Sequence, residues 1–155
     1  MTGRTDARLN ELGIVLPLAP APVANYVPFV ISGGLLFISG QVPLDGGTVR
    51  HVGSLGGNLS IEEGQEAARL CAVNILAQAK SALNGDLDRI VRCVKLGGFV
   101  SSTPAFRDHP KIINAASDLM VAVLGDAGRH ARFAVGAPSL PLGSAVEIEA
   151  IFEIR

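Results

Sequence analysis

Three ionisable residues near the C-terminus lie in sequence that is otherwise apolar. Arg132 begins an apolar segment, and a guanidinium in such a place usually pairs with a planar group such as a carboxylate. Glu147 and Glu149 alternate with apolar residues, so on a β-strand they share one face. The arginine therefore favours recognition of a carboxylate. A half-exposed strand with a solvated acidic face is the alternative for the glutamates, above all for Glu149.

The composition bounds the class of protein and its partners. A chain of 155 residues has the length of one domain with a real core. A formal net charge of -1, with 13 Lys and Arg and no basic run, disfavours a nucleic-acid partner. Because 48% of the residues are hydrophobic and only 17% are charged, we expect some apolar surface to be buried between subunits.

The sequence also bears on compartment and metal binding. Residues 12–44 are uncharged, but prolines and glycines interrupt them, so no apolar helix of roughly 20 residues fits there. Residues 1–6 lack the apolar core of a signal peptide, and we expect a cytoplasmic protein. Cys71 and Cys93 have no paired-cysteine spacing, and the three histidines share no ligand spacing. We therefore expect reduced thiols and no metal site.

Periodicity and turn residues predict an α+β chain, beginning with a helix and a small hairpin. The first half is expected to contain a helix at 5–12, a proline-rich extended arm at 16–25, strands at 26–32 and 35–40, and a glycine-rich loop at 45–58 with a short strand around Val49. The tight turn between the two strands is indicated by Gly33 and Gly34.

The second half alternates helices and strands. Ser60 and Glu63 form a capping box that should begin a helix reaching about Asn84. After it we expect a strand at 88–101, a helix at 110–124, a turn at 125–130 and two final strands. The apolar stripes of the two helices are predicted at Ala68, Ala72, Ile75, Ala79 and Leu83, and at Ile113, Ser117, Met120, Val121 and Leu124. The helices can cover only one sheet face, so a partner should hide the other.

Three blocks of sequence, within 21–26, 37–43 and 132–150, together resemble the Rid family. This is the YjgF-like family of reactive intermediate deaminases, also labelled L-PSP endoribonucleases. The resemblance covers residues 21–155 as a single domain and leaves 1–20 as an additional N-terminal helix and arm. It implies a chorismate-mutase-like α+β fold, with a mixed sheet carrying two helices on one face. It also implies a homotrimer with a barrel-like centre and ligand clefts between subunits.

The resemblance also implies an activity, namely hydrolysis of enamines and imines such as 2-aminoacrylate to 2-keto acids and ammonia. Such an enzyme is a 2-iminobutanoate/2-iminopropanoate deaminase. Arg132 matches the family arginine, which would hold the substrate carboxylate bidentately. Glu147 matches the acid that orients or activates the attacking water. No cofactor is needed, because an imine is already electrophilic.

Four further residues match positions that line the family's cleft, namely Tyr26, Ser39, Gly40 and Asn114. Tyr26, the only tyrosine, has the alternative of a core residue with a satisfied hydroxyl. Ser39 is also typical of a hydrogen-bonded strand serine, and Gly40 of a β-bulge. The match of Asn114 to the family's asparagine is open, because the segment between Asn114 and Arg132 is one residue longer than in the family.

Other positions leave the function open. Ala134 stands beside Arg132 where many relatives carry Cys or Thr, which would alter the cleft or the choice of substrate. His130 is expected at the surface or in a turn. Because it shares a strand face with Arg132, the alternative is a role in tuning the cleft. Besides the deaminase, we consider a non-catalytic trimeric module that binds a 2-keto acid or similar carboxylate. Ribonuclease activity is disfavoured by the lack of a basic groove and by 5% aromatic residues.

Overall fold

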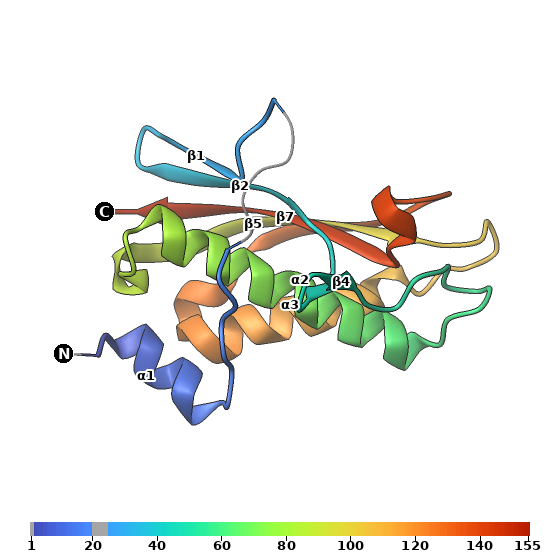
Figure 1. Cartoon of the computed structure of the whole chain (residues 1–155), viewed down its shortest axis with the longest axis horizontal. Coiled ribbons are helices and arrows are strands. Elements are labelled where there is room, and N and C mark those ends of the chain that lie inside the picture. The colour runs from blue at the N-terminus through green and yellow to red at the C-terminus, as the bar shows by residue number, and fades with distance from the viewer. Residues whose placement is uncertain (1, 20–24) are drawn as a thin grey trace.

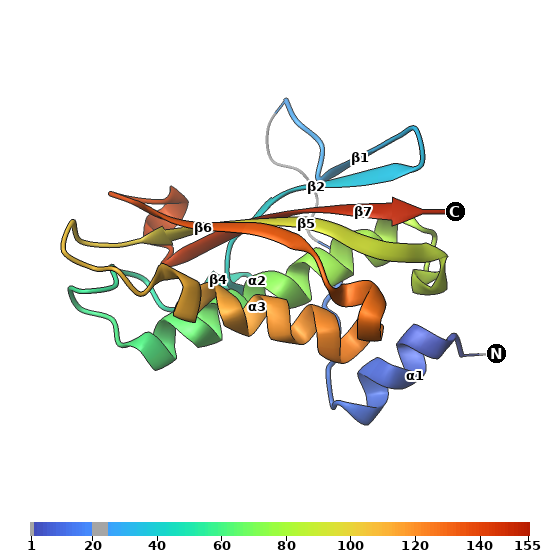
Figure 2. The same ribbon diagram turned by 180° about the vertical axis from the view of Figure 1, so that it is seen from behind.

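A five-stranded mixed sheet with two long helices on one face forms the body of the molecule (Figures 1 and 2). This computed structural model describes residues 2–19 and 25–155. The strand order is β1-β2-β7-β5-β6, and the predicted α+β class is confirmed. The helices are α1 (Arg4–Glu11), α2 (Ile61–Ala82) and α3 (His109–Leu124), with short 3₁₀ turns η1 (Leu87–Arg89), η2 (Gly125–Gly128) and η3 (Pro141–Gly143). The sheet consists of β1 (Phe29–Ser32), β2 (Leu35–Gln41), β5 (Ile90–Ser101), β6 (Ala131–Ala137) and β7 (Val146–Ile154).

The sheet has one covered face and one open face. Strand β5 runs parallel to β6, and the other neighbouring pairs are antiparallel. On β7 the side chains of Val146, Ile148 and Ala150 are buried beneath the helices, and the intervening glutamates point to the other face, as predicted. The open face carries apolar side chains that are 37–49% exposed, namely Val30, Phe37, Phe99 and Val135.

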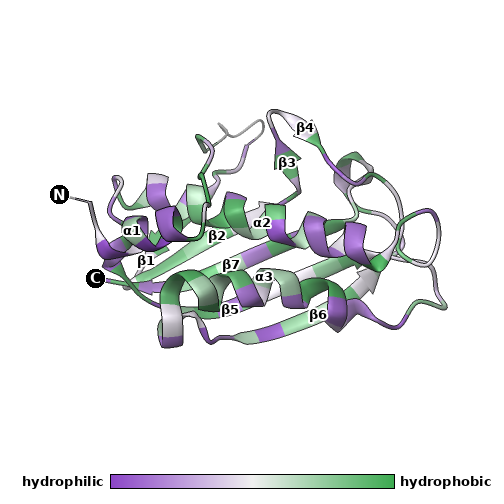
Figure 3. Cartoon of the chain, turned by 90° about the horizontal axis from the view of Figure 1, so that it is seen from below, coloured by the Kyte–Doolittle hydropathy of each residue, from purple (hydrophilic) through white to green (hydrophobic). Residues whose placement is uncertain are grey.

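The two long helices lie side by side across the sheet (Figure 3). The capping box of α2 is confirmed: the Glu63 amide donates to Ser60 Oγ at 3.1 Å, and the Ser60 amide donates to Glu63 Oε2 at 2.7 Å. The predicted stripe of α2 is buried throughout. On α3 the buried residues are Ile112, Ile113, Ala116, Leu119, Met120 and Val123. The predicted α3 stripe was thus partly wrong, because α3 packs against both α2 and the sheet and its buried face is rotated.

The first hairpin is shorter than the sequence indicates. Strand β1 begins at Phe29 and leaves Tyr26 ahead of it, although the Ser39 amide still donates to the Pro28 carbonyl at 2.9 Å. The turn at Gly33 and Gly34 is confirmed, with φ of 58° and 77° at the two glycines. The short strand predicted around Val49 is observed as β4 (Thr48–Val49). It pairs with β3 (Leu44–Asp45) in a small hairpin at the start of the 45–58 loop.

A third helix, α1, packs outside the other two and confirms the helix predicted at 5–12. Leu9 and Ile14 are buried in the same apolar cluster as α2 and the sheet. The expected boundary between residues 20 and 21 lies outside the described residues. Of the helices within 2–19 and 25–155, none combines the length and apolarity required to cross a bilayer.

A remote carboxylate holds the N-terminus of α1. Asp88 Oδ2 accepts from the Arg4 amide at 2.8 Å, and Oδ1 accepts from the Thr5 amide at 2.8 Å and the Thr5 hydroxyl at 2.7 Å. Asp88 therefore satisfies helix amides that have no partner within the helix. These bonds, led by those from the Thr5 side chain and amide, hold the pKa of Asp88 below its ordinary value.

We expect Asp88→Ala to loosen α1 by about 0.5–2 kcal/mol, the range measured when a capping side chain is replaced by alanine. Because the folded-state pKa of Asp88 is lowered, its contribution is complete above the unfolded pKa of about 4 and is lost as the pH falls through the folded value. Hydrogen exchange of the α1 amides measures the effect, with Asp118→Ala at an exposed position of α3 as the control. Equal protection of α1 in both variants would contradict the docking role.

Candidate functional site

Arg132 lies on the edge strand β6 and faces α3. Its Nη1 donates to Asn114 Oδ1 at 2.9 Å and to Ser117 Oγ at 3.1 Å. The two oxygens lie three residues apart on α3, so they present neighbouring acceptors to one guanidinium nitrogen. The structure thus places Asn114 with Arg132 despite the additional residue between them in the sequence.

The guanidinium keeps its positive charge without an acidic partner. Within the part of the chain that the structure describes, Arg132 forms no salt bridge, and Nη1 makes both of its hydrogen bonds. An arginine has five N–H donors, and the Nε–Nη2 edge matches the two oxygens of a carboxylate. Arg132 is therefore anchored by neutral oxygens and keeps one bidentate edge for an anion.

Glu147 lies on the open face of β7, directly opposite Phe99 of β5. Its carboxylate lies over the backbone of Gly40, where an added Cβ would collide with Oε1. Burial raises the pKa of Glu147, and the neighbouring Glu149 carboxylate raises it further. A partly buried carboxylate with a raised pKa is suited to accept a proton near neutral pH.

Ser39 and Gly40 form a β-bulge beside Glu147. Ile38 pairs with Ala150 and Gln41 with Ile148, so the two residues between them oppose Glu149 alone. The Ser39 hydroxyl donates to the Val27 carbonyl at 2.7 Å. Both alternatives considered for these positions, a bonded strand serine and a bulge glycine, are thus observed.

Tyr26 precedes β1, next to Val27. Its side chain is 56% exposed in the single chain, which excludes the core position that the sequence left open. Its neighbour Val27 accepts the hydrogen bond from Ser39, so Tyr26 belongs to the same end of the β1–β2 pair. Tyr26 is available to a ligand or to another subunit.

The candidate residues therefore form two groups. Arg132 and Asn114 lie at the helix-covered side of the sheet edge, whereas Glu147, with Ser39 and Gly40 beside it, lies toward the open face. Strand β5 separates β6 from β7, and the register pairs Leu96 with Arg132 but Phe99 with Glu147. Because Leu96 and Phe99 point to opposite faces, one chain does not bring Arg132 and Glu147 together.

Ser117, beside Arg132, has a larger part in the site than the sequence indicated. Ser117 was expected in the apolar stripe of α3, yet its hydroxyl bonds Arg132 and lies 2.8 Å from His130 Nε2. The spacing of three residues from Asn114 was the signal available for it. Ala134 lies two residues beyond Arg132 on the same face and packs against the core, as the alternation predicts.

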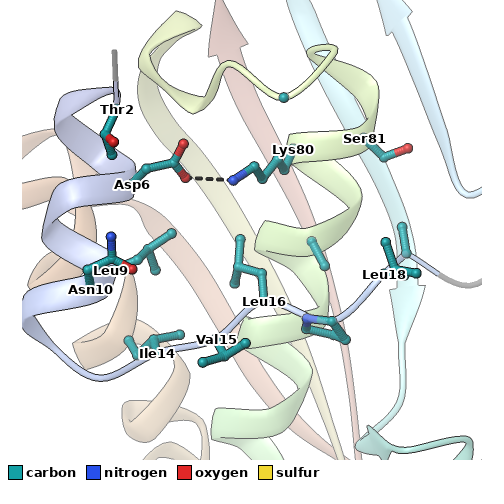
Figure 4. A pocket seen from close by; sticks show the side chains of 14 residues that line it. Thr2, Asp6, Leu9, Asn10, Ile14, Val15, Leu16, Leu18, Lys80 and Ser81 are labelled. Atoms are coloured by element: carbon teal, nitrogen blue, oxygen red, sulfur yellow. Dashed lines mark hydrogen bonds and ion pairs between the residues drawn. The ribbon is translucent and has the colours of Figure 1, made fainter.

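A large cavity lies away from both groups, between α1, the segment after it and the end of α2 (Figure 4). It measures about 890 Å³ and is lined mainly by apolar side chains. Its charged lining groups in the described chain, Asp6 and Lys80, pair with one another at 2.8 Å. The cavity therefore offers no uncompensated charge to a carboxylate, and we do not assign the candidate chemistry to it.

The thiols are buried and unpaired with each other, as the sequence predicts. Burial raises the pKa of Cys93 to about 12 and also raises that of Cys71, so both thiols stay neutral. In residues 2–19 and 25–155, no group of three His, Cys, Asp or Glu side chains is arranged to hold a metal ion.

Comparison with known proteins assigns the chain to a family. Residues 6–154 match the family model described as "YjgF/chorismate_mutase-like, putative endoribonuclease". The chain therefore belongs to the YjgF/L-PSP family and has its chorismate-mutase-like fold. The match begins inside α1, so the helix falls within the family region.

Three relatives match nearly the whole chain. Protein TCP17 of Trypanosoma cruzi is 49% identical over 155 residues, covering 99% of this chain and 96% of the relative. A protein with unknown function from Agrobacterium tumefaciens is 54% identical, with a TM-score of 0.92 and coverage of 97% and 92%. A "putative endoribonuclease" from Shewanella oneidensis is 36% identical, with a TM-score of 0.93 and coverage of 98% and 100%.

Proposed function

We propose that this protein is a homotrimeric deaminase that hydrolyses enamines and imines of the 2-aminoacrylate type to 2-keto acids and ammonia. The observation that carries the proposal is the anchored guanidinium of Arg132, which has no acidic partner in the described chain and keeps its Nε–Nη2 edge unbonded there. Such an edge fits the carboxylate of a 2-imino acid. The cytoplasm is the compartment we propose, since Cys71 and Cys93 are free thiols.

The proposed chemistry uses water as the second reactant. With its carboxylate held by Arg132, the substrate presents the imine carbon in a fixed position. A water molecule adds to that carbon while Glu147 accepts a proton from the water. Glu147 returns that proton to the imine nitrogen, which gives a carbinolamine. Transfer of the hydroxyl proton to the same nitrogen then accompanies cleavage of the carbon–nitrogen bond, so that ammonia leaves and the keto acid remains.

A cleft with both Arg132 and Glu147 needs two chains, because in one chain they lie on opposite faces of the sheet. The open face also carries the partly exposed side chains of Phe37, Phe99 and Val135, which favour burial against another subunit. A closed trimer that brings the Arg132 edge of one subunit to the Glu147 face of the next meets both requirements. Its open faces would then surround the barrel-like centre.

The second candidate is a trimeric module that binds a 2-keto acid or similar small carboxylate without turnover. The separation of Arg132 from Glu147 within one chain favours it, since the anion site is complete without the acid. Ribonuclease activity, which the family description suggests, has weaker support. The chain has a formal net charge of -1 and no basic run to follow a phosphate backbone.

The first experiment measures keto-acid release from 2-aminoacrylate generated in situ, alongside sedimentation of the protein at micromolar concentration. We expect acceleration over the uncatalysed reaction and a trimeric mass. Tight binding of 2-ketobutyrate without acceleration across several imines would favour the binding module. A monomer in sedimentation would exclude a cleft shared between subunits.

A further inference from the structure

A chain of hydrogen bonds connects Arg132 to the turn that precedes β6. His130 Nδ1 lies 2.6 Å from the Gly128 carbonyl oxygen, and its Nε2 lies 2.8 Å from Ser117 Oγ. Ser117 Oγ in turn accepts from Arg132 Nη1 at 3.1 Å. The hydrogen bonds therefore lead from η2 through His130, which precedes β6, to Ser117 of α3 and then to Arg132 of β6. Strand β6 and α3 lie side by side (Figure 2).

The chemistry of the groups decides which atom donates and which accepts in each of these hydrogen bonds when His130 is neutral. A carbonyl oxygen only accepts, so Nδ1 of His130 carries the proton that bonds Gly128. In the neutral form of the ring, Nε2 then has a lone pair that accepts from the Ser117 hydroxyl. With its proton directed to His130, the oxygen of Ser117 faces Arg132 as an acceptor.

Close packing holds one end of this series of hydrogen bonds in place, and a hydrogen bond from Arg132 to Asn114 holds the other. Gly128 is buried, and an added Cβ there would collide with the carbonyl oxygen of Met120 on α3. The turn therefore lies directly on α3, which fixes the carbonyl that orients His130. At the other end, Asn114 Oδ1 accepts a hydrogen bond from the second N–H of Arg132 Nη1, at a distance of 2.9 Å.

We propose that Ser117 and His130 are positioning residues that hold the guanidinium of Arg132 with its Nε–Nη2 edge directed to the substrate carboxylate. With both protons of Nη1 bonded to α3, the guanidinium plane is set by two acceptors. Loss of the Ser117 bond leaves one acceptor and lets the plane rotate about the remaining bond. The inference rests on the proposed function, because it assumes that Arg132 binds the carboxylate.

The test compares Ser117→Ala, Ser117→Thr and His130→Gln with wild type by calorimetric titration of 2-ketobutyrate and by deaminase kinetics. We expect Ser117→Ala to weaken binding about 3- to 10-fold, the usual net contribution of one hydrogen bond, and to raise KM. Ser117→Thr restores the hydroxyl and should recover most of the affinity. His130→Gln, whose amide can still accept from Ser117 but loses the Gly128 bond, should give an intermediate value. Asp118→Ala, an exposed neighbour on α3, is the matched control.

A double-mutant cycle separates positioning from a general structural role. In an Arg132→Lys background, which should keep measurable binding, Ser117→Ala should cause little further loss of affinity, because the lysine ammonium has no guanidinium plane to orient. A structural role would instead give the same additional loss in both backgrounds and overturn the proposal. Wild-type affinity in Ser117→Ala would also overturn it while leaving the proposed function intact. If wild type neither binds 2-ketobutyrate nor accelerates imine hydrolysis, the proposed function fails, and this inference with it.

Discussion

Arg132→Ala is expected to abolish measurable binding of 2-ketobutyrate while leaving the protein folded. Truncating one member of a hydrogen-bonded charge pair costs about 2–5 kcal/mol, which corresponds to a loss of affinity of at least roughly 30-fold. The fold should survive, because the partners that Arg132 leaves behind are neutral, with Asn114 exposed and Ser117 half-buried. Water can satisfy both at this sheet edge.

Two further variants make the Arg132 result specific. Arg132→Lys keeps the charge but lacks the planar fork, so binding should fall between wild type and Arg132→Ala. Arg129→Ala removes an exposed arginine three residues earlier, which pairs with Asp126 at 3.6 Å, and should bind like wild type. Titration calorimetry gives the affinities and thermal melting reports the fold. Unfolding of Arg132→Ala would make Arg132 structural and remove the site assignment.

Glu147→Gln is expected to lower kcat by roughly 10²- to 10⁴-fold, the usual range for loss of a general acid or base. Glutamine is nearly isosteric and so preserves the packing over Gly40. It cannot accept the proton from water. The kinetics of keto-acid release measure this loss, and 2-ketobutyrate binding through Arg132 should be retained.

The raised pKa of Glu147 also predicts a change in stability. A carboxylate whose folded-state pKa is raised destabilises the fold where it is ionised in both states, that is, above the folded value. Glu147→Gln should therefore be at least as stable as wild type at neutral pH. This advantage should shrink as the pH falls from the folded pKa to the unfolded value of about 4.3, because folded Glu147 then takes up a proton.

The neighbouring Glu149→Gln serves as the control for Glu147→Gln. It removes the second cause of the raised pKa and should retain most activity, with the acidic limb of the rate profile moved to lower pH. The measurements are kcat against pH and urea unfolding at several pH values. Wild-type turnover by Glu147→Gln would show that another group accepts the proton.

Much of the secondary structure could be predicted from neighbouring residues alone. The capping box at Ser60 and Glu63 begins α2 because both of its bonds join residues three apart. The alternation on β7 correctly assigned Glu147 and Glu149 to one face, since side-chain direction along one strand is a local property. The stripe of α3 was harder, because the buried face of a helix depends on which elements it packs against.

The sequence by itself determined the kinds of group available, namely an arginine in apolar surroundings and two glutamates that alternate with core residues. Only the tertiary structure decided that Arg132 and Glu147 face opposite sides of the sheet, because that relation depends on the pairing of β6 and β7 with β5. The tertiary structure also decided that Asp88 accepts hydrogen bonds from the first residues of α1, because Thr5 and Asp88 are 83 residues apart in the sequence. Such contacts are set by packing and register between distant segments, which no local spacing records.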